Sequence, residues 1–160
     1  LTKANLATDT HPVFSPDGKT LVYLAMSRPM YEADRFRVMV RPFPDGDAKE
    51  LAPGWDRSPH TLAFTRDGKG LLATADDIGQ RRIFSLDLAS GKVRPLPGEG
   101  AFDVPFEADG GRIVAVYESL KSPPELVSMK GDGSDVKPVT RVNPELAAMA
   151  FGDYEQFSFK

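Results

Sequence analysis

The amino-acid sequence predicts an all-β fold, a β-propeller fragment of about three four-stranded antiparallel blades. Three observations predict it. A Phe-x-x-Asp-Gly motif begins at Phe14, Phe64 and Phe106, so its copies lie roughly 40 to 50 residues apart, which is the length of one blade. An apolar run of the kind that forms a buried strand follows each copy. Glycine and proline, 14 of each, are spread along the chain as frequent turns require.

The Asp-Gly pairs predict the first hairpin of each blade, because glycine adopts positive φ without steric strain and aspartate can bond to its own backbone. These pairs are Asp17-Gly18, Asp67-Gly68 and Asp109-Gly110, and the third copy matches the motif least well. The strands that follow them are expected at residues 21–25, 71–75 and 113–117.

Two further strands complete each predicted blade. Alternating apolar residues predict third strands at 36–40, 83–88 and 126–129, and short outer strands are expected at 49–52, 93–96 and 136–140. The predicted blades span about residues 8–52, 55–97 and 100–140, and residues 141–160 form an exit segment. Within it, Asn143 is expected to cap a helix that has Pro144 in its first turn.

A single β-sandwich or barrel is the structural alternative, because those folds also combine short strands with many turns. Neither fold requires the Phe-x-x-Asp-Gly motif to recur at the same strand junction, whereas a stack of blades does. The repeat therefore favours the propeller.

Composition narrows the possible partners and leaves the compartment open. The net charge is only −3, and basic residues are scattered among acidic ones, so neither nucleic acid nor a membrane surface is expected as a partner. No apolar stretch approaches the ~20 residues of a membrane span. The absence of cysteine excludes disulfides and thiol chemistry, but it does not decide between cytoplasm and periplasm.

The first copy, from His11 through Phe14 to Tyr23, resembles the Asp-Gly type of propeller repeat. Three segments then resemble the acylaminoacyl-peptidase and dipeptidyl-peptidase branch of the prolyl oligopeptidase family of serine peptidases. They are residues 25–35, the Trp55-Asp-Arg57-Ser run with residues 74–77, and the exit region at 120–126, 139–146 and 155–159. The resemblance implies a seven-bladed propeller, an active site facing its channel, and an α/β-hydrolase domain after Lys160.

Catalytic chemistry is not expected within residues 1–160. The α/β-hydrolase nucleophile normally lies in Gly-x-Ser-x-Gly, and this motif does not occur in the sequence. No His, Cys or acidic cluster has the spacing of metal ligands, so no metal or other cofactor is expected. His11 and His60 begin equivalent strands of two blades, which favours a structural or channel-lining role for both.

The long loop from residue 26 to 35 is the most promising functional region, because such loops often contact substrate or a neighbouring domain. The candidate residues of the substrate channel or domain interface are Arg28, Tyr31, Asp34, Arg35, Asp56 and Arg57. The alternative for the loop is that Asp34 only forms an ion pair with Arg28 or Arg35 and stiffens it.

These features together predict the substrate-gating propeller of a peptidase that hydrolyses short peptides, with catalysis performed by the hydrolase domain. A propeller of the Tol-associated kind, which binds proteins and performs no chemistry, is the alternative, since it uses the same repeat. Three blades cannot close a ring, so self-association through the uncovered end blades is also expected.

Overall fold

The computed structural model describes residues 2–159, except the side chain of Ala147. Its first blade is an antiparallel sheet with the strand order β1-β2-β3-β4. The strands are β1 (Asp9–Phe14), β2 (Thr20–Ala25), β3 (Arg37–Pro42) and β4 (Lys49–Glu50).

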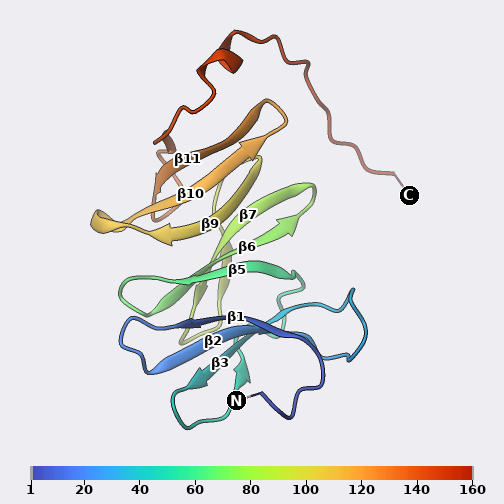
Figure 1. Ribbon diagram of the computed structural model, residues 1–160, viewed down its shortest axis with the longest axis vertical. Helices are drawn as coiled ribbons and strands as arrows, with labels where there is room; N and C mark the ends of the chain where they lie inside the picture. The colour runs from blue at the N-terminus through green and yellow to red at the C-terminus, as the bar shows by residue number, and fades with distance from the viewer. Residues whose placement is uncertain (1, 160) are drawn as a thin grey trace.

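The second and third blades repeat this arrangement. The second contains β5 (Pro59–Phe64), β6 (Gly70–Asp77), β7 (Gln80–Asp87) and β8 (Val93–Pro95); the third contains β9 (Ala101–Glu107), β10 (Arg112–Ser119), β11 (Ser122–Lys130) and β12 (Lys137–Pro138). One parallel pair, Arg81 with Ala101, joins the two blades into a continuous eight-stranded sheet. The blades stack on one another along the molecule (Figure 1), so the predicted all-β propeller fragment of three four-stranded blades is confirmed.

The repeated motif builds its turn as its residue types require. The Asp17 carboxylate accepts hydrogen bonds from the Ser15 hydroxyl at 2.6 Å and the Lys19 amide at 3.0 Å. Gly18 completes the turn with φ +71°. The second copy uses Thr65, Asp67 and Lys69 in the same way.

The third copy folds differently at its turn. Glu107 stands where the first two copies have Ser15 and Thr65, so the aspartate has no hydroxyl donor at that position. A short 3₁₀ helix, η1 (Asp109–Gly111), connects the two strands instead, with positive φ at Gly110 and Gly111.

Two apolar cores hold the blades together. The core between the first and second blades combines Val22, Leu24 and Val38 with Leu71 and Phe84, among others. The core between the second and third blades includes Leu72, Ile83, Phe102, Ile113 and Met129. Because each core takes side chains from two neighbouring sheets, each blade is stabilised by the next one.

The two ends of the blades carry different connections. The Asp-Gly turns lie at one end, on the left of Figure 1, and we call it the Asp-Gly face. The loop at residues 26–36 and the turns after β6 and β10 lie at the other end, which we call the loop face. Among residues 2–159, no helix is long and apolar enough to cross a membrane.

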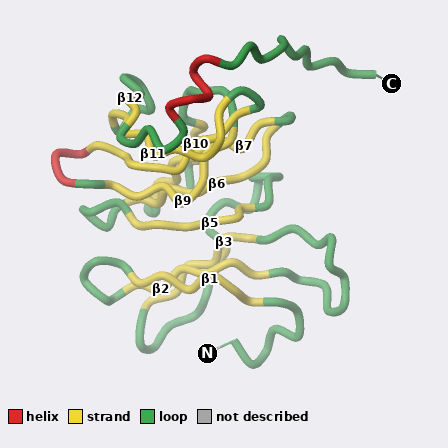
Figure 2. The backbone as a smooth tube through the Cα atoms, turned by 45° about the horizontal axis from the view of Figure 1, so that its top comes forward, coloured by secondary structure: helices red, strands yellow, loops and turns green. Residues whose placement is uncertain are grey.

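The exit segment is fixed to β11, the third strand of the last blade. The Glu125 carboxylate accepts hydrogen bonds from the Thr140 hydroxyl at 2.5 Å and the Val142 amide at 2.7 Å, which fixes the start of the exit segment. The expected helix is a single 3₁₀ element, η2 (Pro144–Ala148), shown in red in Figure 2. Asn143 makes no side-chain capping bond to it, so the predicted cap is wrong.

Candidate functional site

A cleft of about 610 Å³ opens on the loop face between the first and second blades. Its lining combines the long loop with the first residues of the two inner strands. It includes His11, Asp34, Arg35, Asp56 and His60. Three of the six predicted site residues therefore share one cleft with both histidines.

Asp34 fastens the loop at residues 26–36. Its carboxylate accepts hydrogen bonds from the amide of Ser27 at 2.6 Å, the amide of Arg28 at 2.8 Å and the Ser27 hydroxyl at 2.9 Å. These bonds, that from the Ser27 amide first, lower the pKa of Asp34 to about 2. Asp34 therefore stiffens its loop through backbone and hydroxyl hydrogen bonds, and the Arg35 guanidinium of the expected ion pair contacts Glu50 instead.

Arg35 ties the loop to the segment that crosses from the first blade to the second. Its guanidinium lies 2.8 Å from the Glu50 carboxylate and donates to the carbonyl oxygen of Trp55 at 2.7 Å. The two charged side chains are 32% and 21% exposed. Such a partly buried, two-ended contact holds one wall of the cleft in place.

Arg28 and Tyr31 lie outside the lining of this cleft. The Arg28 guanidinium stacks over the Tyr31 ring at 5.3 Å from its centroid, and both side chains are exposed. Between them, Met30 is fully exposed and has φ +62°. The loop therefore presents an apolar tip to its surroundings, away from the ion pairs at its base.

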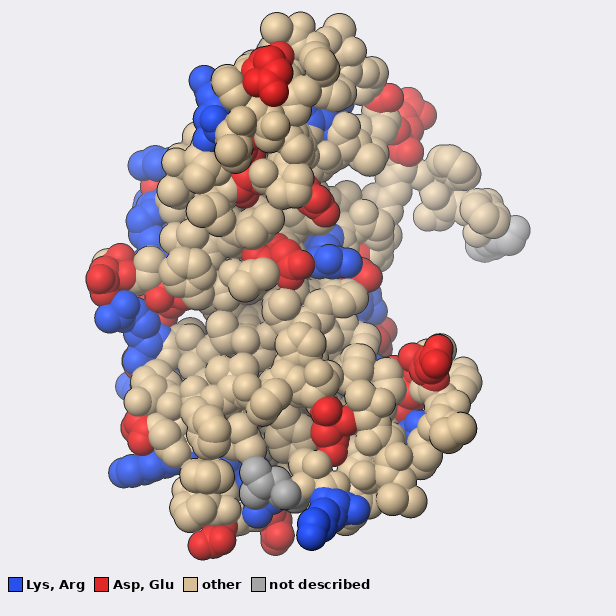
Figure 3. Space-filling view, in the orientation of Figure 1, with Lys and Arg blue, Asp and Glu red and all other residues tan. Residues whose placement is uncertain are grey.

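Arg57 pairs with two carboxylates at the edge of the second blade. It lies 2.6 Å from Asp56 and 2.8 Å from Asp77, and these contacts, led by the hydrogen bond with Asp77, raise its pKa. Arg57 does not line the cleft, whereas Asp56 does. Charged side chains of both signs are interspersed on the visible face of the molecule (Figure 3), which agrees with these local pairs.

The two histidines lie near the starts of β1 and β5. His60 Nε2 lies 3.1 Å from Asp76, which also pairs with Arg81 at 3.1 Å. His11 Nδ1 lies 3.2 Å from the Thr10 hydroxyl. Both rings are exposed and line the cleft, and a channel-lining role for them stays a prediction.

Sequence reasoning missed the acidic partners of this site. Glu50 and Asp77 hold the two site arginines, and Glu32 adds a further carboxylate to the cleft lining. Glu32 lies in the loop already singled out and could have been added from its position. Glu50 and Asp77 come from other strands, and no local sequence signal links them to their arginines. Within residues 2–159, no group of three or more His, Cys, Asp or Glu side chains is placed to hold a metal ion.

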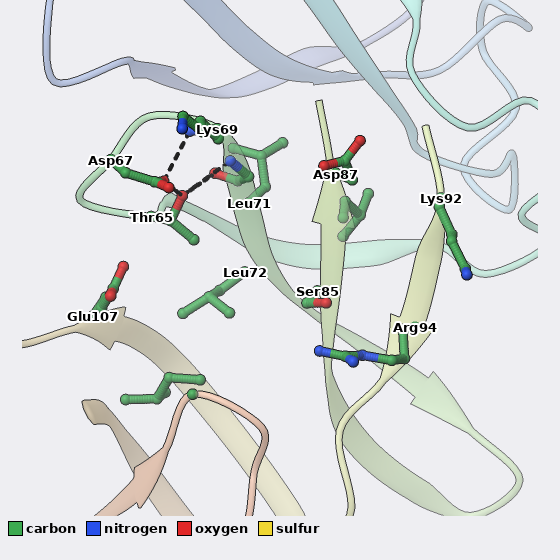
Figure 4. A pocket seen from close by; sticks show the side chains of 14 residues that line it. Thr65, Asp67, Lys69, Leu71, Leu72, Ser85, Asp87, Lys92, Arg94 and Glu107 are labelled. Atoms are coloured by element: carbon green, nitrogen blue, oxygen red, sulfur yellow. Dashed lines mark hydrogen bonds between the residues drawn. The ribbon is translucent and has the colours of Figure 1, made fainter. Parts of the chain in front are cut away.

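A second cleft of about 440 Å³ lies between the second and third blades on the Asp-Gly face. Figure 4 shows Arg94 beside Ser85, with Leu72 nearer Thr65 and Glu107. The acidic side chains are already engaged: Asp67 bonds to Thr65 and Lys69, and Glu107 accepts the Arg66 amide at 2.8 Å. Because the acids serve the turns and the cations balance them, we interpret this cleft as a seam between blades.

Comparison with known proteins gives the chain its relatives. No family model matches the sequence. The chain is 30% identical over 166 residues to dipeptidyl-peptidase 5 of Aspergillus fumigatus, and the alignment covers 93% of this chain and 22% of that protein. It is 26% identical to dipeptidyl-peptidase 5 of Porphyromonas gingivalis, over 89% of this chain and 21% of that protein. The chain thus spans about a fifth of the length of the curated relatives that it matches.

Solved structures share the fold. The acylaminoacyl peptidase of Pyrococcus horikoshii superposes with a TM-score of 0.64 at 19% identity, over 82% of this chain and 20% of its own. A protein assigned as TolB of Agrobacterium tumefaciens gives a TM-score of 0.67 at 21% identity, over 82% of this chain and 46% of its own. At these identities the likeness establishes the propeller fold alone, and the sequence relatives distinguish the family. The chain belongs to the prolyl oligopeptidase family of peptidases, as a segment of the family's β-propeller.

Proposed function

We propose that this segment is the substrate-gating part of a serine peptidase that hydrolyses short peptides, of the dipeptidyl aminopeptidase or acylaminoacyl peptidase type. The alignment with dipeptidyl-peptidase 5 over 93% of the chain is the observation that carries the proposal. In it, catalysis belongs to an α/β-hydrolase domain elsewhere in the complete protein, and the propeller admits extended peptides through its channel and excludes folded proteins.

The cleft on the loop face is the proposed contact surface for the peptide or for the hydrolase domain. Two features support this role. The segment after the last blade reaches the loop face, where the Gln156 side chain donates to the Ile78 carbonyl oxygen at 2.7 Å, so a following domain would begin on that face. The cleft is also held open by bonds between side chain and backbone at Asp34 and Arg35, which prepares it for contact without reordering.

The experiment compares the complete protein with the isolated chain of residues 1–160. The complete protein is expected to cleave a dipeptidyl or acyl-aminoacyl chromogenic substrate, and a serine-directed inhibitor should abolish the cleavage. The isolated chain should leave the substrate intact. Inhibitor-sensitive cleavage by residues 1–160 alone would show that catalysis has been assigned to the wrong part.

A non-catalytic binding propeller of the Tol-associated kind is the second candidate, because TolB has the same fold. The sequence relatives favour the peptidase. The coding sequence downstream of residue 160 separates the two: a Gly-x-Ser-x-Gly motif supports the peptidase, and further Asp-Gly repeats without it support the binding protein.

A further inference from the structure

Each of the three inner strands is interrupted by a β-bulge. In β1 the pairing with β2 shifts at His11, in β5 the pairing with β6 shifts at His60, and in β9 the pairing with β10 shifts at Val104. All three bulges lie in the strand that precedes the repeated turn. A bulge re-aims the side chain at its position, and repeated bulges are structural features of a fold rather than defects.

Two of these positions are strained and exposed. His11 has φ +50° and Val104 has φ +44°. A β-branched residue at positive φ is a genuine outlier of backbone conformation. Val104 is nevertheless 60% exposed, so packing does not compensate for the strain, although its amide is satisfied by the Asp103 carboxylate at 2.9 Å. The His60 side chain is 41% exposed.

The inner strands are the ones nearest the axis of a propeller, and their side chains otherwise pack between blades. His11, His60 and Val104 lie at the bulges of these strands, and their side chains are exposed. His11 and His60 also line a single cleft between the first and second blades. We propose that His11, His60 and Val104 form part of a collar that narrows the channel and selects peptides by cross-section; the proposal rests on the function proposed for this propeller.

The chemistry of the collar suits the passage of an extended peptide. The three side chains are an isopropyl group and two imidazoles, and the Asp76 carboxylate lies 3.1 Å from the His60 ring. The bulges also break the row of backbone donors and acceptors along each inner edge, which prevents a passing peptide from pairing as an added strand. The collar therefore admits an unfolded chain without retaining it.

Peptide-length selectivity of the complete protein tests the collar. Val104→Trp should lower kcat/KM for peptides of about 20 residues on the order of tenfold, and leave a dipeptidyl anilide within about twofold. Val136→Trp is the matched control, because Val136 is 48% exposed just before β12, on the outer side of a blade. Equal effects of the two variants, or an equal loss on both substrates, would overturn the collar and leave the proposed function in place.

Cysteine labelling tests the position of the collar without relying on activity. Val104→Cys and Val136→Cys are each introduced into the complete protein. After digestion, mass spectrometry measures how much of the fragment that contains the introduced cysteine has been modified. A small maleimide should label both positions, whereas a maleimide attached to a large polymer should label only position 136. Labelling of position 104 by the polymer would place it outside a constriction and refute the collar. If the wild-type protein cleaves no peptide at all, the proposed function fails, while the labelling result still decides the collar.

Discussion

Leu71 offers a direct measure of how strongly the first and second blades depend on each other. It is 0% exposed and packs in the same core as Val22 and Leu24 of the neighbouring blade. Leu71→Ala removes three buried carbons, which at about 0.8 kcal/mol each amounts to roughly 2.4 kcal/mol. The cavity left behind increases the loss, so we expect the free energy of unfolding to fall by about 3–4 kcal/mol.

Urea unfolding followed by tryptophan fluorescence measures this loss. Trp55, the sole tryptophan, packs 5.1 Å from Phe84 beside the same core, so its emission reports on this seam. Leu120→Ala is the control, since Leu120 is 75% exposed and should cost less than about 0.5 kcal/mol. Measurements at several protein concentrations separate unfolding from dissociation. If Leu71→Ala costs no more than Leu120→Ala, the blades do not share a core.

Three other predictions concern the loop, a glycine and the open blades. Asp34→Ala should speed amide hydrogen exchange across residues 26–36, because it removes the carboxylate that accepts the loop's hydrogen bonds. In the wild type, the pKa of Asp34 is lowered to about 2 in the folded state. The loop should therefore be fully ordered above the ordinary pKa of 3.8 and lose its order as the pH falls toward 2. Unchanged exchange in the variant would contradict this role. Gly100→Ala should lower the free energy of unfolding by about 2 kcal/mol or more, because Gly100 has φ +96° and a Cβ there would lie 2.7 Å from the Tyr117 ring. Gly18→Ala should lower it by only about 1 kcal/mol, because Gly18 has φ +71° but a Cβ there would meet open space. Equal shifts of the melting temperature in the two variants would refute the difference. Residues 1–160 alone should form dimers or larger assemblies through their uncovered end blades, and a strictly monomeric sedimentation profile at high concentration would count against this.

The sequence predicted the repeat and the positions of its strands, but not the exact end of every strand. The Asp-Gly turns and apolar runs located the strands because those signals are local. The second strand of the middle blade nevertheless extends to Asp77, two residues past the apolar run, where Asp76 pairs with Arg81 of the next strand. The outer strand expected at 136–140 is only Lys137–Pro138 in the structure. Proline lacks an amide donor, so it shortens the strand where the apolar pattern alone suggests continuation.

The candidate site was predictable only in part for a related reason. The loop at residues 26–36 was recognisable from its length and charge, and Asp34 and Arg35 do anchor it. Their functions depend on partners brought close by the stacking of sheets, such as Glu50 for Arg35 and Asp77 for Arg57. The bulge at Val104 has even less local signal, because valine normally favours regular strands.

The pair between Arg81 and Ala101 makes the two seams of this molecule mechanically unequal. Backbone hydrogen bonding links the second and third blades, whereas the first blade, within residues 2–159, forms a separate sheet held to the second by side chains. Thermal breathing should therefore separate the first blade from a stiffer two-blade block. The cleft with His11 and His60 lies along this weaker interface between the first and second blades. A sideways opening of the propeller would therefore begin at this cleft.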